Sequence, residues 1–393
     1  MAQSAAPRLR LGVAGLGRAF ALMLPTLQQD PRVMLVAAAD PRPEARQRFA
    51  ADFGGTAYDS VAELCADPSV DVVYVATPHQ HHAEHVRLAT AHGKHVLVEK
   101  PIALTIADAE AMIAAARAAS VHLIVGHSHS FDAPVLRTRA LIDSGAYGAV
   151  RMITAFNFTE FLHRPRRPEE LDTAQGGGAL FNQAPHQVDI VRLLGGGRVA
   201  RVRAMTGAWN AARPTEGAYA ALLAFENGAF ASLVYNGYGH FDSDEFVDWI
   251  GELGQKKEPR AAPALRRFAD QIEESAAKAA RNYGGPDWKA PMKENLLHQH
   301  FGTILVSCER GDLRPLPTGV MIYSTGAARL DPIPPPEVPR AEVIDELYAT
   351  VVEGRPPLHD GAWAMATLEV CLAILRSARE GDDVALRHQV GVP

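Results

Sequence analysis

The stretch that decides the fold reads LRLGVAGLG and spans residues 9–17. Its first six residues are mostly apolar, glycines follow at Gly15 and Gly17, and a segment of helical length comes next. Glycine at the end of a strand permits a tight turn and lets a pyrophosphate approach backbone N–H groups at a helix N-terminus. The third glycine of the dinucleotide-binding pattern is absent, because Phe20 occupies its place. The stretch therefore predicts the first strand–turn–helix unit of a nucleotide-binding domain.

Four more short apolar runs continue this pattern through the first third of the chain, at residues 33–39, 70–76, 95–98 and 122–125. Continuous apolar runs are typical of strands that are covered on both faces of a parallel sheet. Segments of helical length separate the runs, and Thr105–Ala119 begins with a threonine at its expected N-cap. We therefore expect a doubly wound α/β domain, a Rossmann domain, over residues 1–128.

The sequence after Gly126 predicts a second domain whose fold class differs from that of the first. The expected strands now alternate apolar and polar residues, and Glu226-Asn227-Gly228 is typical of a turn between two of them. We expect an α+β domain over residues 129–340 with a large, mostly antiparallel open sheet. A polar interruption at about 242–298, with a charged helical stretch near Ala264–Arg281, is interpreted as an insertion. Residues 341–393 predict two helices that pack back on the first domain.

Composition narrows the class of protein. Hydrophobic residues make up 47% and charged residues 21%, as in ordinary folded proteins. A formal net charge of -6 gives no basic field for nucleic acid or an acidic membrane. The three cysteines lie far apart, which argues against a disulfide framework or a cysteine zinc site. No apolar run has the length of a membrane span or signal peptide, so we expect a cytoplasmic protein without nucleic-acid or membrane partners.

Asp40 closes the second expected strand at about the distance where a carboxylate accepts the ribose hydroxyls of a dinucleotide. This favours NAD over NADP, although Arg42 lies two residues later and leaves NADP open. The alternative, that the glycines only turn the chain, explains neither the strand–helix order nor Asp40. The further candidate cofactor contacts follow strands or open the first helix, and they are Gly15, Leu16, Gly17, Arg18, Ala19, Thr77, Pro78, His79, His82, Glu99 and Lys100.

Two motifs carry the candidate chemistry. Glu99-Lys100-Pro101 follows an expected parallel strand, and ligands bind beyond the carboxyl ends of such strands. GGGALFNQAPHQVD, at residues 176–189, places Asn182, His186 and Asp189 four and three residues apart, on one face if the stretch is helical. A neutral imidazole can take a hydroxyl proton as hydride leaves the same carbon. Taken singly, Lys100 is better explained as a surface lysine, whereas His186 is equally well explained as a core residue.

Histidines are dense between His79 and His85, which raises the question of a metal. No carboxylate–histidine spacing of a metal site accompanies them. We interpret them as solvated loop residues and expect no metal.

Together these motifs resemble the Gfo/Idh/MocA oxidoreductase family, over nearly the whole chain outside the insertion. The matching text is GLG at 15–17, TP at 77–78 with His82, GKHVLVEKP at 93–101 and the 176–189 segment. The resemblance implies that Lys100 and His186 are the catalytic pair and that the protein is a homo-oligomer, a dimer or tetramer. Where the family often has an aspartate this chain has Asn182, so the role of base shifts to His186. Lys100 would hydrogen-bond the reacting oxygen, and Asp189 would orient His186 or bind substrate.

Within the family, residues 236–245 and 298–301 are similar to enzymes that oxidise phthalate cis-4,5-dihydrodiol to 4,5-dihydroxyphthalate. The resemblance implies that this small molecule is the substrate and that the protein serves aromatic, phthalate catabolism. An aromatic dicarboxylate requires fixed cations, and arginine forks match carboxylates. A solvated basic loop is the alternative interpretation of those arginines. The candidate substrate contacts are His127, His129, Arg164, Arg166, Arg167, Tyr235 and His240.

Two other functions remain open at this stage. A sugar or polyol dehydrogenase of the same family would recognise hydroxyls through Asn, Asp and His instead of paired arginines. A nucleotide-dependent sensor would bind a ligand without turning it over, and it would need neither Lys100 nor His186 for chemistry.

Overall fold

A computed structural model describes residues 7–126, 128–259, 270–291 and 296–392. The chain forms two compact units. Unit 1 comprises residues 1–127, 276–293 and 338–365, and unit 2 comprises residues 128–275, 294–337 and 366–393. Each unit is therefore built from three separate stretches of chain.

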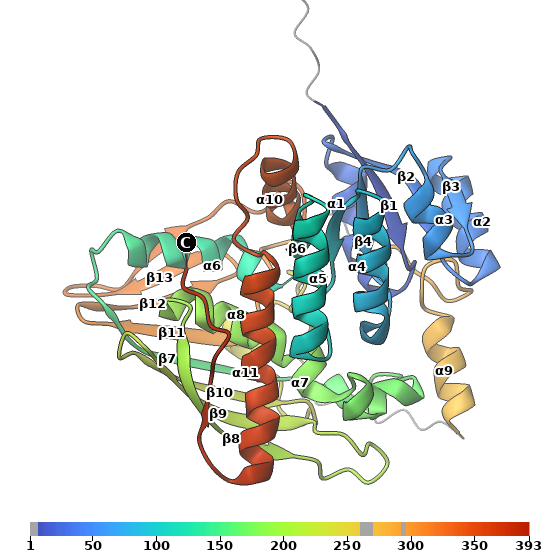
Figure 1. The fold of residues 1–393 in the computed structure, drawn as a ribbon. Helices are drawn as coiled ribbons and strands as arrows, with labels where there is room; N and C mark the ends of the chain where they lie inside the picture. The colour runs from blue at the N-terminus through green and yellow to red at the C-terminus, as the bar shows by residue number, and fades with distance from the viewer. Residues whose placement is uncertain (1–6, 127, 260–269, 292–295, 393) are drawn as a thin grey trace, which may run out of the picture. The chain divides into compact units, whose positions relative to one another are not determined.

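Unit 1 contains a six-stranded sheet in the order β3-β2-β1-β4-β5-β6, and all of its strand pairs are parallel. Apolar side chains cover both faces, because β4 is buried at every position. The predicted doubly wound sheet is confirmed (Figure 1). Its strands are β1 (Leu9–Ala14), β2 (Val33–Ala39), β3 (Thr56–Tyr58), β4 (Val72–Val75), β5 (His95–Val98) and β6 (Leu123–Val125).

The helices between these strands begin where the sequence provides a cap or a favourable first turn. The side chain of Thr105 accepts a hydrogen bond of 3.1 Å from the backbone N–H of Asp108, as its place before the helix predicts. Pro43 starts its helix at a position where a missing N–H costs nothing. The five helices are α1 (Arg18–Gln29), α2 (Pro43–Phe53), α3 (Val61–Ala66), α4 (His82–Ala91) and α5 (Ile106–Ala118).

Unit 2 contains a nine-stranded sheet in the order β14-β13-β12-β11-β7-β10-β9-β8-β15. Every pair is antiparallel except β7 with β10. The predicted large, mostly antiparallel sheet is confirmed. Its strands are β7 (Val150–Phe158), β8 (Val199–Gly207), β9 (Ala218–Phe225), β10 (Phe230–Asn236), β11 (Thr303–Cys308), β12 (Gly311–Leu316), β13 (Gly319–Tyr323), β14 (Arg329–Pro332) and β15 (Val384–Ala385).

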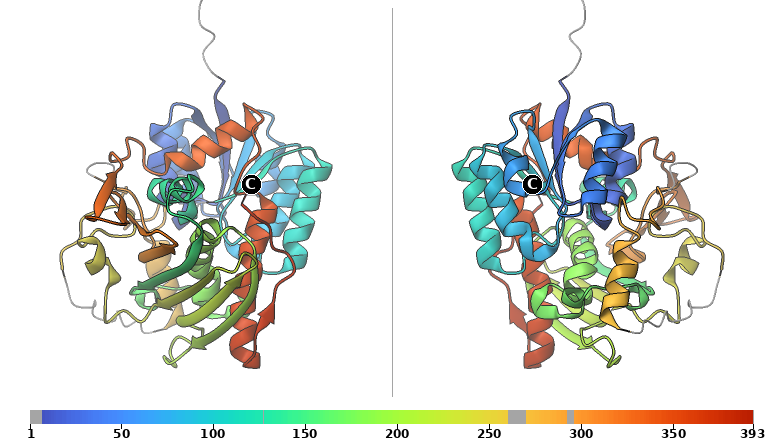
Figure 2. Two further views of the ribbon diagram at one scale, coloured as in Figure 1. Left: turned by 90° about the vertical axis from the view of Figure 1, so that its left-hand side faces the viewer. Right: turned by 90° about the vertical axis from the view of Figure 1, so that its right-hand side faces the viewer.

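One face of this sheet is covered by helices. α8 (Ala184–Gly195) packs against β7 and β10, and α6 (Ala133–Asp143) packs against β12 and β13 (Figure 2). All twelve residues of α8 are buried, which explains its mostly apolar composition. The short helix α7 (Gly178–Asn182) directly precedes α8. The 176–189 motif therefore lies in the core of unit 2.

The segment at 242–298 divides between the units. Residues 276–293 belong to unit 1, whereas most of the rest belongs to unit 2. The predicted helical stretch Ala264–Arg281 overlaps α9 (Gln271–Ala279), and its part before residue 270 lies outside the described residues. In unit 1, Tyr283 packs edge-on against Phe20, and its hydroxyl donates to Asp52 at 2.7 Å. This stretch is thus part of the nucleotide-binding unit.

The two predicted C-terminal helices are α10 (Ala341–Val351) and α11 (Gly361–Glu380). α10 belongs to unit 1, where Asp345 pairs with Arg32 at 2.7 Å. Most of α11 belongs to unit 2. Among the described residues, α11 alone has the length and apolar character of a membrane span, and 61% of its most apolar window is buried. Core helices of folded proteins share these properties.

Candidate active site

The turn after β1 has the geometry of a phosphate-binding turn. Gly15 has a φ of 94°, and a Cβ atom at that position would lie 2.9 Å from the carbonyl oxygen of Ala76. Only glycine accommodates both conditions. α1 begins directly after Gly17, so the predicted contacts Arg18 and Ala19 lie in its first turn. Backbone N–H groups at such a helix start suit an anionic pyrophosphate.

The buried Asp40 and the half-buried Arg42 form one cluster beyond β2. The carboxylate of Asp40 accepts hydrogen bonds from the backbone N–H groups of Leu16 at 2.8 Å and Arg42 at 2.9 Å. The Arg42 guanidinium pairs with the same carboxylate at 3.0 Å and donates to the carbonyl oxygen of Tyr283 at 3.2 Å. A ribose hydroxyl at Asp40 would therefore share the carboxylate with Arg42. Tyr283 was not predicted as a site residue. It contacts Arg42 because residues 276–293 return to unit 1.

Thr77 and Pro78 follow β4, and His79 begins a short helical turn behind them. His82 has no exposed surface. Its ring nitrogens lie 2.9 Å from the carbonyl oxygen of Pro101 and 3.0 Å from that of Thr77. His82 is therefore not the solvated loop residue that we predicted, because its ring ties together the loops that follow β4 and β5. Its contact with the cofactor stays a prediction. Burial lowers the pKa of His82 to about 4.

Glu99 and Lys100 directly follow β5, at the carboxyl edge of the parallel sheet. Glu99 is buried and accepts a hydrogen bond of 2.5 Å from the Tyr74 hydroxyl. Burial, together with this carboxylate, raises the pKa of Tyr74. Lys100 is partly exposed. This edge thus holds a fixed acidic residue and an accessible lysine side by side in the sequence.

In unit 2, the last of the three glycines at 176–178 packs on a buried carboxylate, and Gly177 packs on backbone carbonyl groups of Glu170 and Asp172. Gly178 has a φ of 79°, and a Cβ atom there would lie 2.1 Å from Oε1 of Glu216. That oxygen accepts from the backbone N–H of Leu180 at 3.2 Å, and Thr173 donates to the other oxygen at 2.5 Å. Burial raises the pKa of Glu216. The glycines are therefore explained by close packing within the unit.

Two predicted site residues hold the ends of the 176–189 motif. The Asn182 amide donates to the carbonyl oxygens of Gly178 at 2.8 Å and Gly176 at 3.2 Å. Asp189 is buried and accepts from the hydroxyls of Ser130 and Thr367, the latter at 2.7 Å. Both side chains make anchoring contacts that fix α7 and α8.

His186 lies in a cluster of rings that come from distant parts of the chain. Its ring centroid lies 4.8 Å from that of His129 and 5.1 Å from that of Phe301. The ring of Tyr235 is nearly parallel to Phe301 at 6.3 Å. The structure thus brings together His186, predicted as the base, and the predicted substrate contacts His129 and Tyr235. Phe301 lies in the 298–301 segment and was not among the predicted site residues.

His129 stands between two carboxylates. Its Nδ1 atom lies 2.6 Å from Asp132, and its Nε2 atom lies 3.5 Å from Glu252. Burial opposes a charge on this ring, but the two carboxylates outweigh burial and raise the pKa of His129 to about 9. Burial also opposes the charge on Glu252, yet His129 and then Arg164 lower its pKa to about 2. At neutral pH the three side chains therefore form an anion–cation–anion row.

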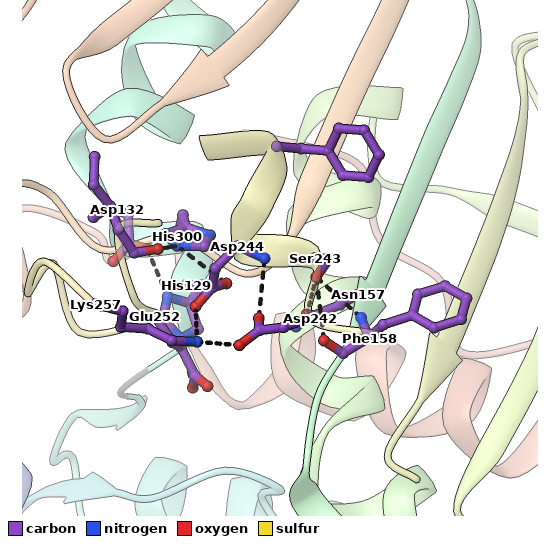
Figure 3. Close-up of polar contacts among 12 residues, drawn as sticks. His129, Asp132, Asn157, Phe158, Asp242, Ser243, Asp244, Glu252, Lys257 and His300 are labelled. Carbon is purple, nitrogen blue, oxygen red and sulfur yellow. Dashed lines mark hydrogen bonds and ion pairs between the residues drawn. The ribbon is translucent and has the colours of Figure 1, made fainter. Parts of the chain in front are cut away.

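Glu252 is presented by a tightly fixed loop after β10 (Figure 3). Lys257 pairs with both Asp242 and Asp244, the latter at 2.6 Å. The His300 ring lies 2.9 Å from the carbonyl oxygen of Ile250, two residues before Glu252. Neither Asp132 nor Glu252 was predicted as a site residue. Asp132 stands three residues after His129 without a recognisable motif, and only the folded loop brings Glu252 to the His129 ring.

The three predicted arginines have different surroundings. Arg164 is exposed, and its guanidinium is close enough to Glu252 and Tyr235 to interact electrostatically with both. Arg166 is buried over the Phe161 ring at 3.8 Å, and its Nε atom has no hydrogen-bond partner among the described residues. Arg167 pairs locally with Glu169 at 3.0 Å.

Two predicted substrate contacts, His240 and His127, are not part of the His186 cluster as described. His240 is exposed after β10, and none of the ring contacts of the His186 cluster involves it. His127 lies outside the described residues. Within the described ranges, no three His, Cys, Asp or Glu side chains gather in the manner of a metal site.

Comparisons with known proteins agree with this geometry. Residues 9–127 match the family described as "Oxidoreductase family, NAD-binding Rossmann fold", and residues 135–255 match the GFO/IDH/MocA C-terminal domain. The 1-carboxy-3-chloro-3,4-dihydroxycyclohexa-1,5-diene dehydrogenase of Comamonas testosteroni is 48% identical over 94% of this chain and 95% of its own. Human trans-1,2-dihydrobenzene-1,2-diol dehydrogenase is 31% identical over 48% of this chain and 57% of its own.

A solved structure gives the same picture of the fold. The putative dehydrogenase from Bordetella bronchiseptica RB50 is 42% identical, with a TM-score of 0.91. The match covers 96% of this chain and all of that one.

Proposed function

The chain belongs to the Gfo/Idh/MocA oxidoreductase family and carries its NAD-binding Rossmann domain, and on that premise we propose that it oxidises a carboxylated cyclohexadiene diol to the corresponding catechol with NAD as acceptor. The specific substrate that we propose is phthalate cis-4,5-dihydrodiol, with 4,5-dihydroxyphthalate as product. The observation that carries the proposal is the similarity, over nearly the full length, to a dehydrogenase whose name gives a carboxylated dihydroxycyclohexadiene.

The residues around the β1 turn fit a dinucleotide. Gly15 and the first turn of α1 would hold the pyrophosphate, and Asp40 would accept the ribose hydroxyls. The nicotinamide, when bound, supplies the acceptor for hydride. Repulsion between Asp40 and a 2′-phosphate favours NAD, while Arg42 on the same carboxylate tempers that preference.

The oxidation removes two hydrogens from one carbon–oxygen unit of the diol. His186, in its neutral form, accepts the hydroxyl proton while the hydride leaves the same carbon. Lys100 hydrogen-bonds the reacting oxygen and stabilises the negative charge that develops on it. Asn182, fixed by the 176–178 turn, orients a hydroxyl without acting as a base. The ketone formed then tautomerises to a catechol, and the gain of an aromatic ring drives the reaction forward.

Recognition of the substrate requires cations and flat apolar surfaces. Phe301 and Tyr235, with nearly parallel rings, offer the surface for a six-membered ring. Arg164 is the foremost candidate for a substrate carboxylate, because it is exposed close to these rings. Arg166 has a spare donor at Nε and is the second candidate. Arg167 is already paired locally and ranks last.

The proposal is tested by following NADH formation. The panel contains phthalate cis-4,5-dihydrodiol, a dihydrodiol with one carboxylate, the uncarboxylated benzene dihydrodiol, myo-inositol and glucose. We expect turnover of the carboxylated dihydrodiols, with NAD preferred over NADP. Turnover of a polyol alone would replace the proposed substrate by a sugar or polyol. Tight NAD binding without any turnover would favour a sensor.

We further propose that the protein is a homo-oligomer that pairs the uncovered faces of its nine-stranded sheets. Apolar side chains stand exposed on neighbouring strands of this sheet, and Phe230 is in register with Met152. Leu222 and Val234 extend the same face. Such patches on one sheet face mark association surfaces. Sedimentation of the protein should give the mass of a dimer or tetramer, and a monomer at micromolar concentration would refute the proposal.

A further inference from the structure

Contacts on several sides hold the His129 ring in place. Each ring nitrogen faces a carboxylate, Asp132 at 2.6 Å and Glu252 at 3.5 Å, and the ring itself contacts His186. A neutral imidazole has one N–H donor, whereas an imidazolium donates from both nitrogens. With 1% of its surface exposed, the His129 ring is shielded from bulk solvent. The geometry thus selects the protonated ring.

We propose that His129 is a positioning residue, held as a cation between Asp132 and Glu252, that fixes the ring of His186 and keeps His186 neutral. The proposal rests on the proposed function, since His186 is the base of that reaction. It also gives the 242–257 loop a role in the chemistry, because this loop supplies Glu252.

The packing of His186 explains why its charge state depends on this neighbour. At a ring separation of 4.8 Å, the cation on His129 disfavours a second positive charge on His186. Phe301 contacts both rings, at 5.4 Å from His129, and replaces water that would screen the two charges. A neutral His186 can accept a proton, whereas a protonated one cannot.

The other charges near His129 within unit 2 act mainly on its partners. Asp132 lies on the same short element, and Glu252 comes from the loop after β10. Arg164 and His300 both act on Glu252. Asp189 on α8 accepts hydrogen bonds from Ser130 and Thr367. Among the described groups of unit 2 named here, the cation on His129 and the carboxylates that hold it therefore act most directly on His186.

Removing the charge of His129 and removing the charge of Glu252 should shift the pKa of His186 in opposite directions. His129→Asn keeps an N–H donor toward Asp132 but removes the cation, so the pKa of His186 should rise by about 1. Glu252→Gln removes one anion, while Asp132, 2.6 Å from Nδ1, still holds the proton on His129, so the pKa of His186 should fall by about 1. A merely structural role of His129 gives no reason for opposite signs.

The titration is measured by NMR on the free enzyme with the histidine Cε1 atoms labelled with carbon-13. The His186 signal is assigned by its loss in His186→Gln. Glu252→Asp, which retains the charge, should restore the wild-type value, and His298→Asn is the matched control because His298 bonds to Pro334 outside the cluster. The acidic limb of the kcat/KM profile should move with the NMR titration.

Unchanged titrations in both variants, or shifts of the same sign, would overturn the proposal. Circular dichroism checks the fold, and if His129→Asn fails to fold, Glu252→Gln decides alone, because the Glu252 side chain is 29% exposed and tolerates the change. The titration needs no substrate. Failure of the wild type to oxidise the dihydrodiol would therefore contradict the proposed function. The NMR titration would still test whether His129 sets the charge state of His186.

Discussion

The two units assemble their candidate residues in different ways. In unit 1 the candidates follow parallel strands in short continuous motifs, such as Gly15–Gly17 after β1 and Glu99-Lys100 after β5. In unit 2 the cluster around His186 brings together His129, His186 and Phe301, which lie more than fifty residues apart in the chain. The first arrangement is set by strand ends, and the second by loops that fold onto one another.

This difference has a physical origin. Parallel strands end at one edge of their sheet, so the residues after each strand meet there whatever the connecting helices contain. No comparable rule brings Asp132, Glu252 and Phe301 together, because each depends on the packing of its own loop. We therefore expect the unit 1 residues to tolerate changes in distant loops and the unit 2 cluster to depend on them.

The largest effect is expected from removing one proposed catalytic group in each unit. Lys100→Ala and His186→Ala should each lower kcat by about 100-fold to 10,000-fold, because each removes a group that acts on the reacting oxygen or its proton. NAD affinity, measured by calorimetry, should change little in either variant. Lys289→Ala, at an exposed position, and His298→Ala are the controls. An equal loss of NAD affinity in both variants would argue against these assignments.

The second effect concerns the stability of the unit 2 cluster. Burial opposes the charge on His129, but Asp132 and Glu252 raise its pKa from 6.5 to about 9. A raised pKa stabilises the fold fully below pH 6.5, and the stabilisation is lost as the pH rises through about 9. Urea unfolding should show a loss of roughly 3 kcal/mol between these limits.

His129→Asn should remove this pH dependence. Wild type and variant would otherwise lose stability in parallel as the pH rises, and that outcome would show that His129 is not the titrating group. Glu252, with a pKa lowered to about 2, contributes stability above pH 4.5 that is lost only as the pH falls through about 2.

The third effect separates the arginines of unit 2. Arg164→Ala should raise KM for a carboxylated dihydrodiol by about tenfold to a hundredfold, since a charge-assisted hydrogen bond contributes about 1.5–3 kcal/mol. KM for benzene dihydrodiol, which lacks a carboxylate, should hardly change. Arg167→Ala is the matched control, because that guanidinium already pairs with Glu169. Equal effects of both variants, or on both substrates, would exclude Arg164 as the carboxylate partner.

The smallest effect is expected at the cofactor turn of unit 1. Asp40→Asn keeps an acceptor for the Leu16 N–H but removes the charge that repels a 2′-phosphate and holds Arg42. The ratio of kcat/KM with NADP to that with NAD should rise about tenfold. Steady-state kinetics with both cofactors measures it, with Glu44→Gln as control. An unchanged ratio would mean that Asp40 does not read the ribose.

The sequence predicted the features that follow from pattern and missed those that follow from folding. The apolar runs predicted β1, β2 and β5 with the observed bounds, because strands buried on both faces of a parallel sheet have nearly continuous apolar sequences. β3 was missed, since its three residues are too short and too exposed to give such a pattern. The mostly antiparallel sheet of unit 2 was also predicted from alternation and turns.

For the site, residue type suggested candidates but not their surroundings. The residue type and position of His82 suggested a cofactor contact, and only its complete burial shows that it also supports the loops that follow β4 and β5. Glu252 lies in a polar stretch that resembles any solvated loop, so its pairing with His129 could not be predicted from the sequence. Lys100 and His186 remain predictions that the kinetics above will decide.

The return of residues 276–293 and 338–365 to unit 1 constrains how this protein can be recombined. The chain passes between the units five times, so neither unit is a single block of sequence. A chimera that exchanged only residues 1–127 with a relative would separate Phe20 and Asp52 from the Tyr283 that their own chain provides. Laboratory exchange of cofactor specificity should therefore transplant all three stretches together, and inherited diversity should arise inside loops more readily than by shuffling whole domains.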